Sequence, residues 1–285
     1  MGALFGIAGT PEEFHEMGYK SGMQVPGFVE QKGLDCFEYQ CGRGVNVSEA
    51  TAAAFGKKAA EHHVALSLHS PYYISLSSQN EESRLKSVDY ILQSARAAKA
   101  MGATRVVVHS GSCAKLTREQ ALEKALDTMR RAVTALDEAG LGDIILCPET
   151  MGKINQLGDV DEVIALCSVD ERLIPAIDFG HLNARTYGTL KTAADFTAVL
   201  DRFSAALGFE RMKHFHCHFS KIEWTAGGEK QHLTFEDHQF GPEPEPFIEA
   251  IVKGGYEPYV VSESAGTQAI DAAILKGLYL VCKGN

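Results

Sequence analysis

The chain has 285 residues, of which 45% are hydrophobic and 22% are charged, a composition typical of globular proteins. The net charge of −10 disfavours attraction to nucleic acid through the bulk field, although bound cations can reverse the sign locally. The seven cysteines include no Cys-x-x-Cys pair, which favours a reduced, cytoplasmic setting over a disulfide framework. No apolar run approaches the ~18 residues of a membrane helix, so no membrane partner is expected. Residues 1–9 predict a first strand rather than a signal peptide.

Short β-rich segments alternate with amphipathic segments along the whole chain. The candidate strands are residues 4–8, 36–40, 64–69, 105–109, 143–149, 173–178, 214–219 and 259–263. The intervening helical segments include residues 82–101, 118–139, 159–168 and 193–207. The first of these has apolar residues at a helical period and stops at Gly102, a typical C-terminal glycine. Thr117 and Gln120 form a sequence-level capping box before the second.

Eight repeats of strand and helix predict parallel strands joined by right-handed crossovers. The fold class is therefore α/β, with a single (β/α)₈ TIM barrel over residues 1–285 as one domain. A doubly wound open sheet is the alternative, but no GxGxxG follows the first strand. The longest segment without periodicity, residues 220–245, is rich in Gly, Glu and Pro, and a loop of this length is expected to be functional.

Six successive candidate strands end in a histidine or a carboxylate, at the face where barrel enzymes have their active sites. These residues are His69, His109, Glu149, Asp178, His216 or His218, and Glu263. Burying so many titratable groups without compensation would cost several kcal/mol each. Histidine nitrogen and carboxylate oxygen are ligands of zinc and manganese. The pattern therefore predicts a cluster of divalent metal ions, with zinc as the first candidate.

Two strand ends require a choice between neighbouring residues. Asp178 and His181 lie three positions apart across a strand–loop turn, so they can reach adjacent metals. His214, His216 and His218 alternate and point to one side of their strand. His216 is the first choice as ligand and His218 the second, while His214 is expected in the barrel interior or behind the ligands.

These strand ends, in this order, resemble the endonuclease IV family of apurinic/apyrimidinic endonucleases. The resemblance is carried by His69-Ser70-Pro71-Tyr72-Tyr73-Ile74, by His109 followed by Ser110-Gly111-Ser112, by Pro148-Glu149-Thr150, by Asp178-Phe179-Gly180-His181, by the segment from His216 to Lys221, and by Glu263. It implies a barrel with up to three zinc ions, or manganese or another divalent metal in their place.

The resemblance also implies a ligand set. His69 and His109 would hold one metal, Glu149 would bridge to a second as the central catalytic carboxylate, and Asp178, His216 and Glu263 would complete that second site. His181 would hold a third metal with His232. The family has an aspartate two residues before that last histidine, where this chain has Lys230, so Glu229 is the substitute candidate. Tyr72, Arg43 and Lys221 would bind substrate.

The function implied by the resemblance is hydrolysis of DNA on the 5′ side of abasic sites, a step of base-excision repair. The alternative is a single-metal sugar isomerase or epimerase of the kind found in the xylose-isomerase superfamily. Glu149, Asp178, His216 and Glu263 would suffice for that chemistry, and an acidic chain suits a small sugar better than DNA. A third possibility is a metal-binding barrel without catalysis.

Overall fold

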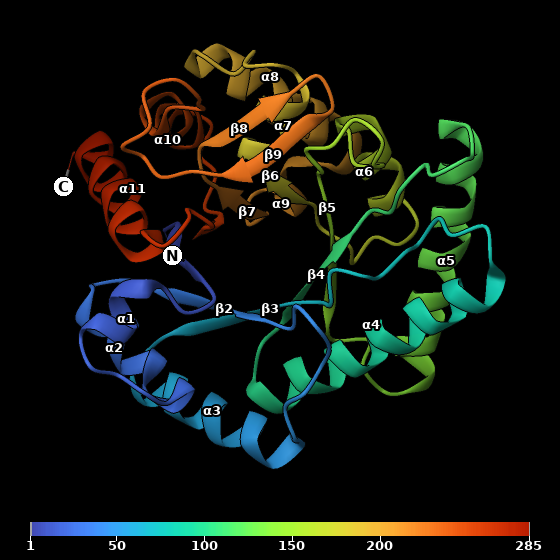
Figure 1. The fold of residues 1–285 in the computed structure, drawn as a ribbon, viewed down its shortest axis with the longest axis horizontal. Helices are drawn as coiled ribbons and strands as arrows, with labels where there is room; N and C mark the ends of the chain where they lie inside the picture. Colours follow the sequence, from blue (N-terminus) through green and yellow to red (C-terminus); the bar gives the residue numbers. More distant parts are fainter. Residues whose placement is uncertain (1, 285) are drawn as a thin grey trace.

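The computed structural model describes residues 2–284. Eight parallel strands close into a barrel in the order β1-β10-β7-β6-β5-β4-β3-β2 (Figure 1). Their bounds are β1 Leu4–Ala8, β2 Cys36–Gln40, β3 Ala65–His69, β4 Arg105–His109, β5 Ile145–Glu149, β6 Ala176–Asp178, β7 His216–Phe219 and β10 Tyr259–Ser262. This confirms the predicted (β/α)₈ barrel and excludes the open doubly wound sheet.

Helices surround the barrel (Figure 1). They are α1 Glu12–Glu16, α2 Val25–Gln31, α3 Glu49–Glu61, α4 Glu81–Met101, α5 Arg118–Glu138, α6 Val160–Cys167, α7 Phe179–Arg185, α8 Ala193–Leu207, α9 Phe209–Met212, α10 Pro244–Lys253 and α11 Gln268–Lys283. The predicted capping box of α5 is present, and Gly102 ends α4 in the left-handed conformation, with φ of 74°. In residues 2–284, no helix is long and apolar enough to cross a membrane.

The C-terminal ends of the strands agree with the sequence prediction within one residue, whereas three strands begin two or three residues later than expected. The predicted starts at residues 143, 173 and 214 become Ile145, Ala176 and His216. The reason is that some of these preceding residues are held by turns: the Leu173 amide donates to the carbonyl of Asp170, for example. An apolar segment before a strand can therefore be buried without pairing as part of the barrel sheet.

The core lies both inside the barrel and between the barrel and its helices. Phe179, Phe196, Phe219 and Phe247 are fully buried between the barrel and helices α8 and α10, with ring centroids 4.9 Å to 5.9 Å apart where they contact. Burying each such side chain stabilises the fold by roughly 1.5–3 kcal/mol. This packing fixes the strand ends that carry the candidate site.

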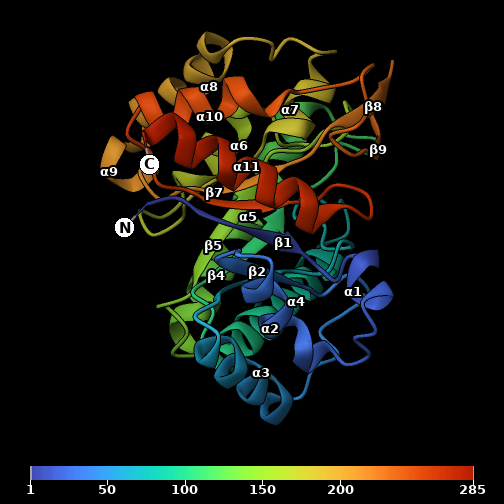
Figure 2. The same ribbon diagram turned by 90° about the vertical axis from the view of Figure 1, so that its left-hand side faces the viewer.

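The segment of residues 220–245 is not the irregular loop predicted from its composition. It contains an antiparallel hairpin, β8 Ile222–Thr225 and β9 Gly228–His232, before α10 begins. Figures 1 and 2 show this hairpin at one end of the barrel. It is attached to the loop after β5, because the Glu229 amide donates to the Gly152 carbonyl and the Ile154 amide to that of Gly227.

Gly228 is required at the start of β9. Its φ is +84°, a left-handed conformation that favours glycine, and a Cβ there would lie 2.2 Å from the Gly152 carbonyl oxygen. The close approach to the β5 loop is what brings the second hairpin strand to the barrel mouth.

Candidate metal centre

Nine side chains form three groups at the C-terminal mouth of the barrel, and each group has donor atoms that all lie within 4.8 Å of one another. The groups are His69, His109 and Glu149; then Glu149, Asp178, His218 and Glu263; and then His181, Glu229 and His232. Glu149 belongs to the first two. Six of the eight barrel strands contribute at or next to their ends, and α7 and β9 supply the remaining residues.

In the first group, Nε2 of His69 and Nε2 of His109 each lie 3.3 Å from Oε2 of Glu149. Nδ1 of His69 lies 2.8 Å from the Ser70 carbonyl oxygen, which can only accept, so Nδ1 carries the proton and Nε2 faces the mouth. Burial alone would lower the pKa of His69, but Glu149, with Glu38 and Glu263, raises it to about 9. Burial lowers the pKa of His109 to about 4, which keeps that ring neutral.

In the second group, Nδ1 of His218 lies 3.1 Å from Oε1 of Glu149 and 3.6 Å from Oε2 of Glu263. Asp178 is fully buried, and its Oδ1 accepts the backbone N–H of His181 at the start of α7. Its other oxygen, Oδ2, has no hydrogen-bond partner; the nearby Nδ1 of His181 donates instead to the Thr150 carbonyl at 2.9 Å. Burial raises the pKa of Asp178.

The orphaned Oδ2 of Asp178 is evidence that the donors suit a cation. A buried carboxylate oxygen without a donor costs free energy, and here two further carboxylates, Glu149 and Glu263, face the same space. A divalent cation would satisfy all three at once. The mixed nitrogen and oxygen donor set fits zinc or manganese.

In the third group, Nε2 of His181 lies 3.4 Å from Oε2 of Glu229, and its ring centroid is 5.5 Å from that of His232. Nδ1 of His232 lies 2.8 Å from the Ser220 hydroxyl. Glu229 therefore lies with His181 and His232, whereas Lys230 makes an exposed ion pair with Glu223.

The structure brings His218, rather than the first-choice His216, into the donor groups at the mouth. The register of β7 pairs His218 with Asp178, so His218 reaches the mouth, while His216 lies two residues deeper and contacts Glu38. His214 is not in the interior either: it is exposed at the opposite end of the strand, beside the Glu257 carbonyl.

The residues predicted to bind substrate are distributed unevenly. Tyr72 is 61% exposed and lines the mouth, a cavity of about 320 Å³ that also includes Gln40 and Lys153, which sequence reasoning missed. Arg43 is exposed beside the lining residue Gly42. Lys221 does not fit the prediction, because it is buried and its ammonium pairs with Glu243 and donates to the Asp237 carbonyl.

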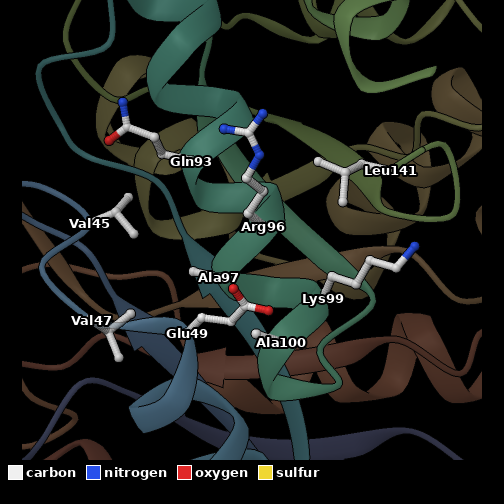
Figure 3. Close-up of a pocket in the computed structure, with 9 residues that line it drawn as sticks. All are labelled: Val45, Val47, Glu49, Gln93, Arg96, Ala97, Lys99, Ala100 and Leu141. Carbon is white, nitrogen blue, oxygen red and sulfur yellow. The ribbon is translucent and has the colours of Figure 1, made fainter. Parts of the chain in front are cut away.

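A larger hollow, of about 560 Å³, lies away from the mouth, beside α4. Figure 3 shows its lining, with Arg96 and Lys99 from α4 and Glu49 from the start of α3. It contains none of the nine donors, so size alone does not identify the site.

Comparison with known proteins finds one matching family and several related sequences. The sequence matches the xylose isomerase-like TIM barrel family over residues 27–278. An uncharacterized protein of Methanocaldococcus jannaschii is 30% identical over 239 residues, covering 83% of each chain. A probable endonuclease 4 of Mycoplasma pneumoniae is 28% identical over 54% of this chain, and the match spans about half of that relative's length, 52%.

Two solved structures share the fold. A D-tagatose 3-epimerase-like protein superposes with a TM-score of 0.72 at 18% identity, covering 99% of this chain and 98% of the other. Endonuclease IV from Thermus thermophilus superposes with a TM-score of 0.66 at 20% identity, covering 99% of both chains. Together with the match over residues 27–278, these findings show that the chain belongs to the xylose isomerase-like TIM barrel family.

Proposed function

We propose that this protein is a metal-dependent phosphodiester hydrolase that cleaves duplex DNA on the 5′ side of abasic sites, with up to three zinc ions at the barrel mouth. The observation that carries the proposal is the surplus of donors. One group of four would serve a single metal, yet two further groups, one of them sharing Glu149, lie at the same mouth. Phosphoryl transfer benefits from adjacent cations, because charge develops on both the attacking and the leaving oxygen.

The residues of the chain have distinct tasks in this proposal. Glu149 directs Oε2 toward His69 and His109 and Oε1 toward His218, so it holds the first two groups side by side. His181, Glu229 and His232 would hold the third ion. When bound, the cations would supply an activated water and neutralise charge on the phosphate.

The rim of the mouth supplies the contacts to DNA in this proposal. Tyr72 is exposed and well placed to stack in the gap left by a missing base, since base–aromatic stacking needs only an accessible ring face. Lys153 lines the cavity and replaces Lys221 as the cation nearest the phosphate, while Arg43 remains an exposed candidate further out. With so few basic groups, binding is expected to be weak and salt-sensitive.

The comparisons support this assignment through relatives named probable endonuclease 4 and through the likeness to endonuclease IV from Thermus thermophilus. The proposal keeps the expectation of a reducing, cytoplasmic setting, since six of the cysteines are buried free thiols.

The test is a nicking assay at low salt. Zinc-loaded protein is incubated with a duplex that carries one abasic site and with the same duplex without it, and the ends of the product are identified. We expect cleavage of the first duplex only, on the 5′ side. Glu149→Gln should lose zinc and cleavage together, whereas Glu123→Gln, which changes a carboxylate on α5 away from the mouth, should keep both.

A sugar isomerase or epimerase is the second candidate, because Glu149, Asp178, His218 and Glu263 form a complete four-residue site without the other two groups. The likeness to a D-tagatose 3-epimerase-like protein favours it as well. This function predicts one manganese or magnesium ion per chain, turnover of a ketose, and no effect of His232→Ala. No nicking at low salt combined with sugar turnover would replace the proposed hydrolase by this function.

A further inference from the structure

Glu38 lies inside the barrel beneath the mouth, on β2, and is fully buried. Its Oε2 lies 2.9 Å from Nε2 of His216 and also accepts from the Ser67 hydroxyl at 2.9 Å. Its Oε1 lies 2.9 Å from Nε2 of His218 and 3.3 Å from the Gln40 amide nitrogen. Both carboxylate oxygens therefore meet only groups that can donate a hydrogen bond.

His218 lies between this carboxylate and the mouth, and its two ring nitrogens face different partners. Nε2 lies closest to Glu38, at 2.9 Å, with Nε2 of His216 further away at 3.3 Å, while Nδ1 faces Glu149 and Glu263. A carboxylate can only accept, so the contact with Glu38 places a proton on Nε2 of His218. Without a metal, Nδ1 also faces a carboxylate, Glu149, at 3.1 Å. With a cation in the second donor group, Nδ1 would offer its lone pair to that cation while Nε2 keeps its hydrogen bond to Glu38. Histidines that bind metals commonly donate their other N–H to a carboxylate in this way.

A deep metal ion among Glu38, His216 and His218 is the competing explanation, because their donor atoms also lie within 4.8 Å of one another. The environment of His216 disfavours it. Nδ1 of His216 is buried and has no hydrogen-bond partner. If Nε2 bound a metal, Nδ1 would carry a proton that nothing accepts. If Nε2 donates to Glu38, Nδ1 is only an unused acceptor, the less costly arrangement.

We propose that Glu38 is a positioning residue, which holds the Nε2–H groups of His216 and His218 and thereby presents Nδ1 of His218 to the metal bound by Glu149, Asp178 and Glu263. The metal and its reaction rest on the proposed function, but the hydrogen-bond arrangement does not. Glu38 itself touches neither the metal nor the substrate. Its contribution is to select the nitrogen and the ring orientation that His218 offers.

The direct test is the protonation of the ring nitrogens, measured by nitrogen-15 NMR on histidine-labelled protein, zinc-loaded and after chelation. We expect Nε2 of both His216 and His218 to carry a proton in each state. In the zinc-loaded protein, Nδ1 of His218 should show the shift of a coordinated nitrogen. Coordination through Nε2 of His216 or His218 would overturn the proposal and indicate the deep metal ion.

The perturbation is Glu38→Gln, which keeps the shape but allows only one oxygen to accept. At least one of the two Nε2–H signals should disappear, and zinc affinity should fall on the order of 10–100-fold, as for other residues that orient metal ligands. Ser67→Ala, which removes only the hydroxyl donor to Glu38, is the matched control and should keep both signals. Retention of both signals and of full zinc affinity in Glu38→Gln would overturn the proposal.

The outcomes for Glu38 and for the proposed function are separable. If the zinc-loaded protein does not cleave abasic DNA but shows the expected nitrogen pattern, the hydrolase fails and the positioning role stands. If Glu38→Gln does not fold, the spectra of the unsubstituted protein still decide which nitrogen of His218 faces the metal.

Discussion

Glu149 should control the pH dependence of stability in the metal-free protein, as well as metal binding. Its carboxylate lies within 3.1 Å to 3.5 Å of ring nitrogens of four histidines, His69, His109, His181 and His218. Burial alone would raise the pKa of Glu149, but hydrogen bonds from His181, His218 and His69 hold it well below its ordinary value. Glu149→Gln removes this negative charge while keeping the shape of the side chain.

The magnitude follows from His69, whose pKa is raised from 6.5 to about 9, with Glu149 the strongest of the groups that raise it. A raised histidine pKa contributes stability that is fully present below pH 6.5 and is lost as the pH rises through about 9. This difference between the two pKa values of His69 stabilises the folded protein by about 3 kcal/mol at pH 6, about 2.5 kcal/mol at pH 7 and only about 0.4 kcal/mol at pH 9. Most of this stabilisation should be lost in Glu149→Gln.

The assay is urea unfolding of the chelated protein and of chelated Glu149→Gln at several pH values. The free energy of unfolding of the unsubstituted protein minus that of Glu149→Gln should be about 2–3 kcal/mol larger at pH 6 than at pH 9. NMR titration should show the pKa of His69 falling from about 9 in the variant, because the strongest of the groups that raise it is gone. A difference in stability that is constant from pH 6 to pH 9, with an unchanged pKa of His69, would refute the reasoning.

Three further predictions concern single side chains. His218→Ala should lower zinc content, while His214→Ala, an exposed residue just before β7, should leave it unchanged in elemental analysis. Gly228→Ala should displace the hairpin from the Gly152 carbonyl and remove about one zinc equivalent, with the barrel still folded by circular dichroism; full zinc content would contradict the role of this hairpin. Thr117→Ala should cost about 1 kcal/mol in urea unfolding by removing the α5 cap, without affecting zinc content.

The parts of the site that the sequence predicts are the residues that end strands. His69, His109, Glu149 and Asp178 could be located because an apolar β-rich run stops at each of them, and parallel strands of a barrel end on one face. Glu263 lies one residue beyond its strand and could be located for the same reason.

The choice between His216 and His218 at β7 depends on geometry that the sequence does not show. His216 and His218 both point into the barrel, since side chains alternate along a strand, so periodicity cannot distinguish them. Only the register against β6, which pairs His218 with Asp178, decides which of them reaches the mouth. Register depends on contacts between distant segments and cannot be predicted from the sequence of either strand alone.

Glu38 and the hairpin were missed for different reasons. Glu38 stands inside a strand rather than at its end, and its neighbours Phe37 and Tyr39 pack outward against Phe55. A single carboxylate on the inward face of a strand is the signal that could have identified it. The β9 segment Glu229-Lys230-Gln231 is polar and has no apolar alternation, so its pairing is visible only in the structure.

The hairpin that carries Glu229 and His232 makes one part of the site separable from the barrel itself. The donors of the first two groups lie on or next to the barrel strands, whose backbone pairing closes the sheet. The third is completed by a short hairpin between β7 and α10, which hydrogen-bonds to the loop after β5 and packs against α7. Evolution can lengthen, shorten or replace such a hairpin without refolding the barrel. Loss or replacement of this hairpin would therefore remove the third donor group and leave the other two in place.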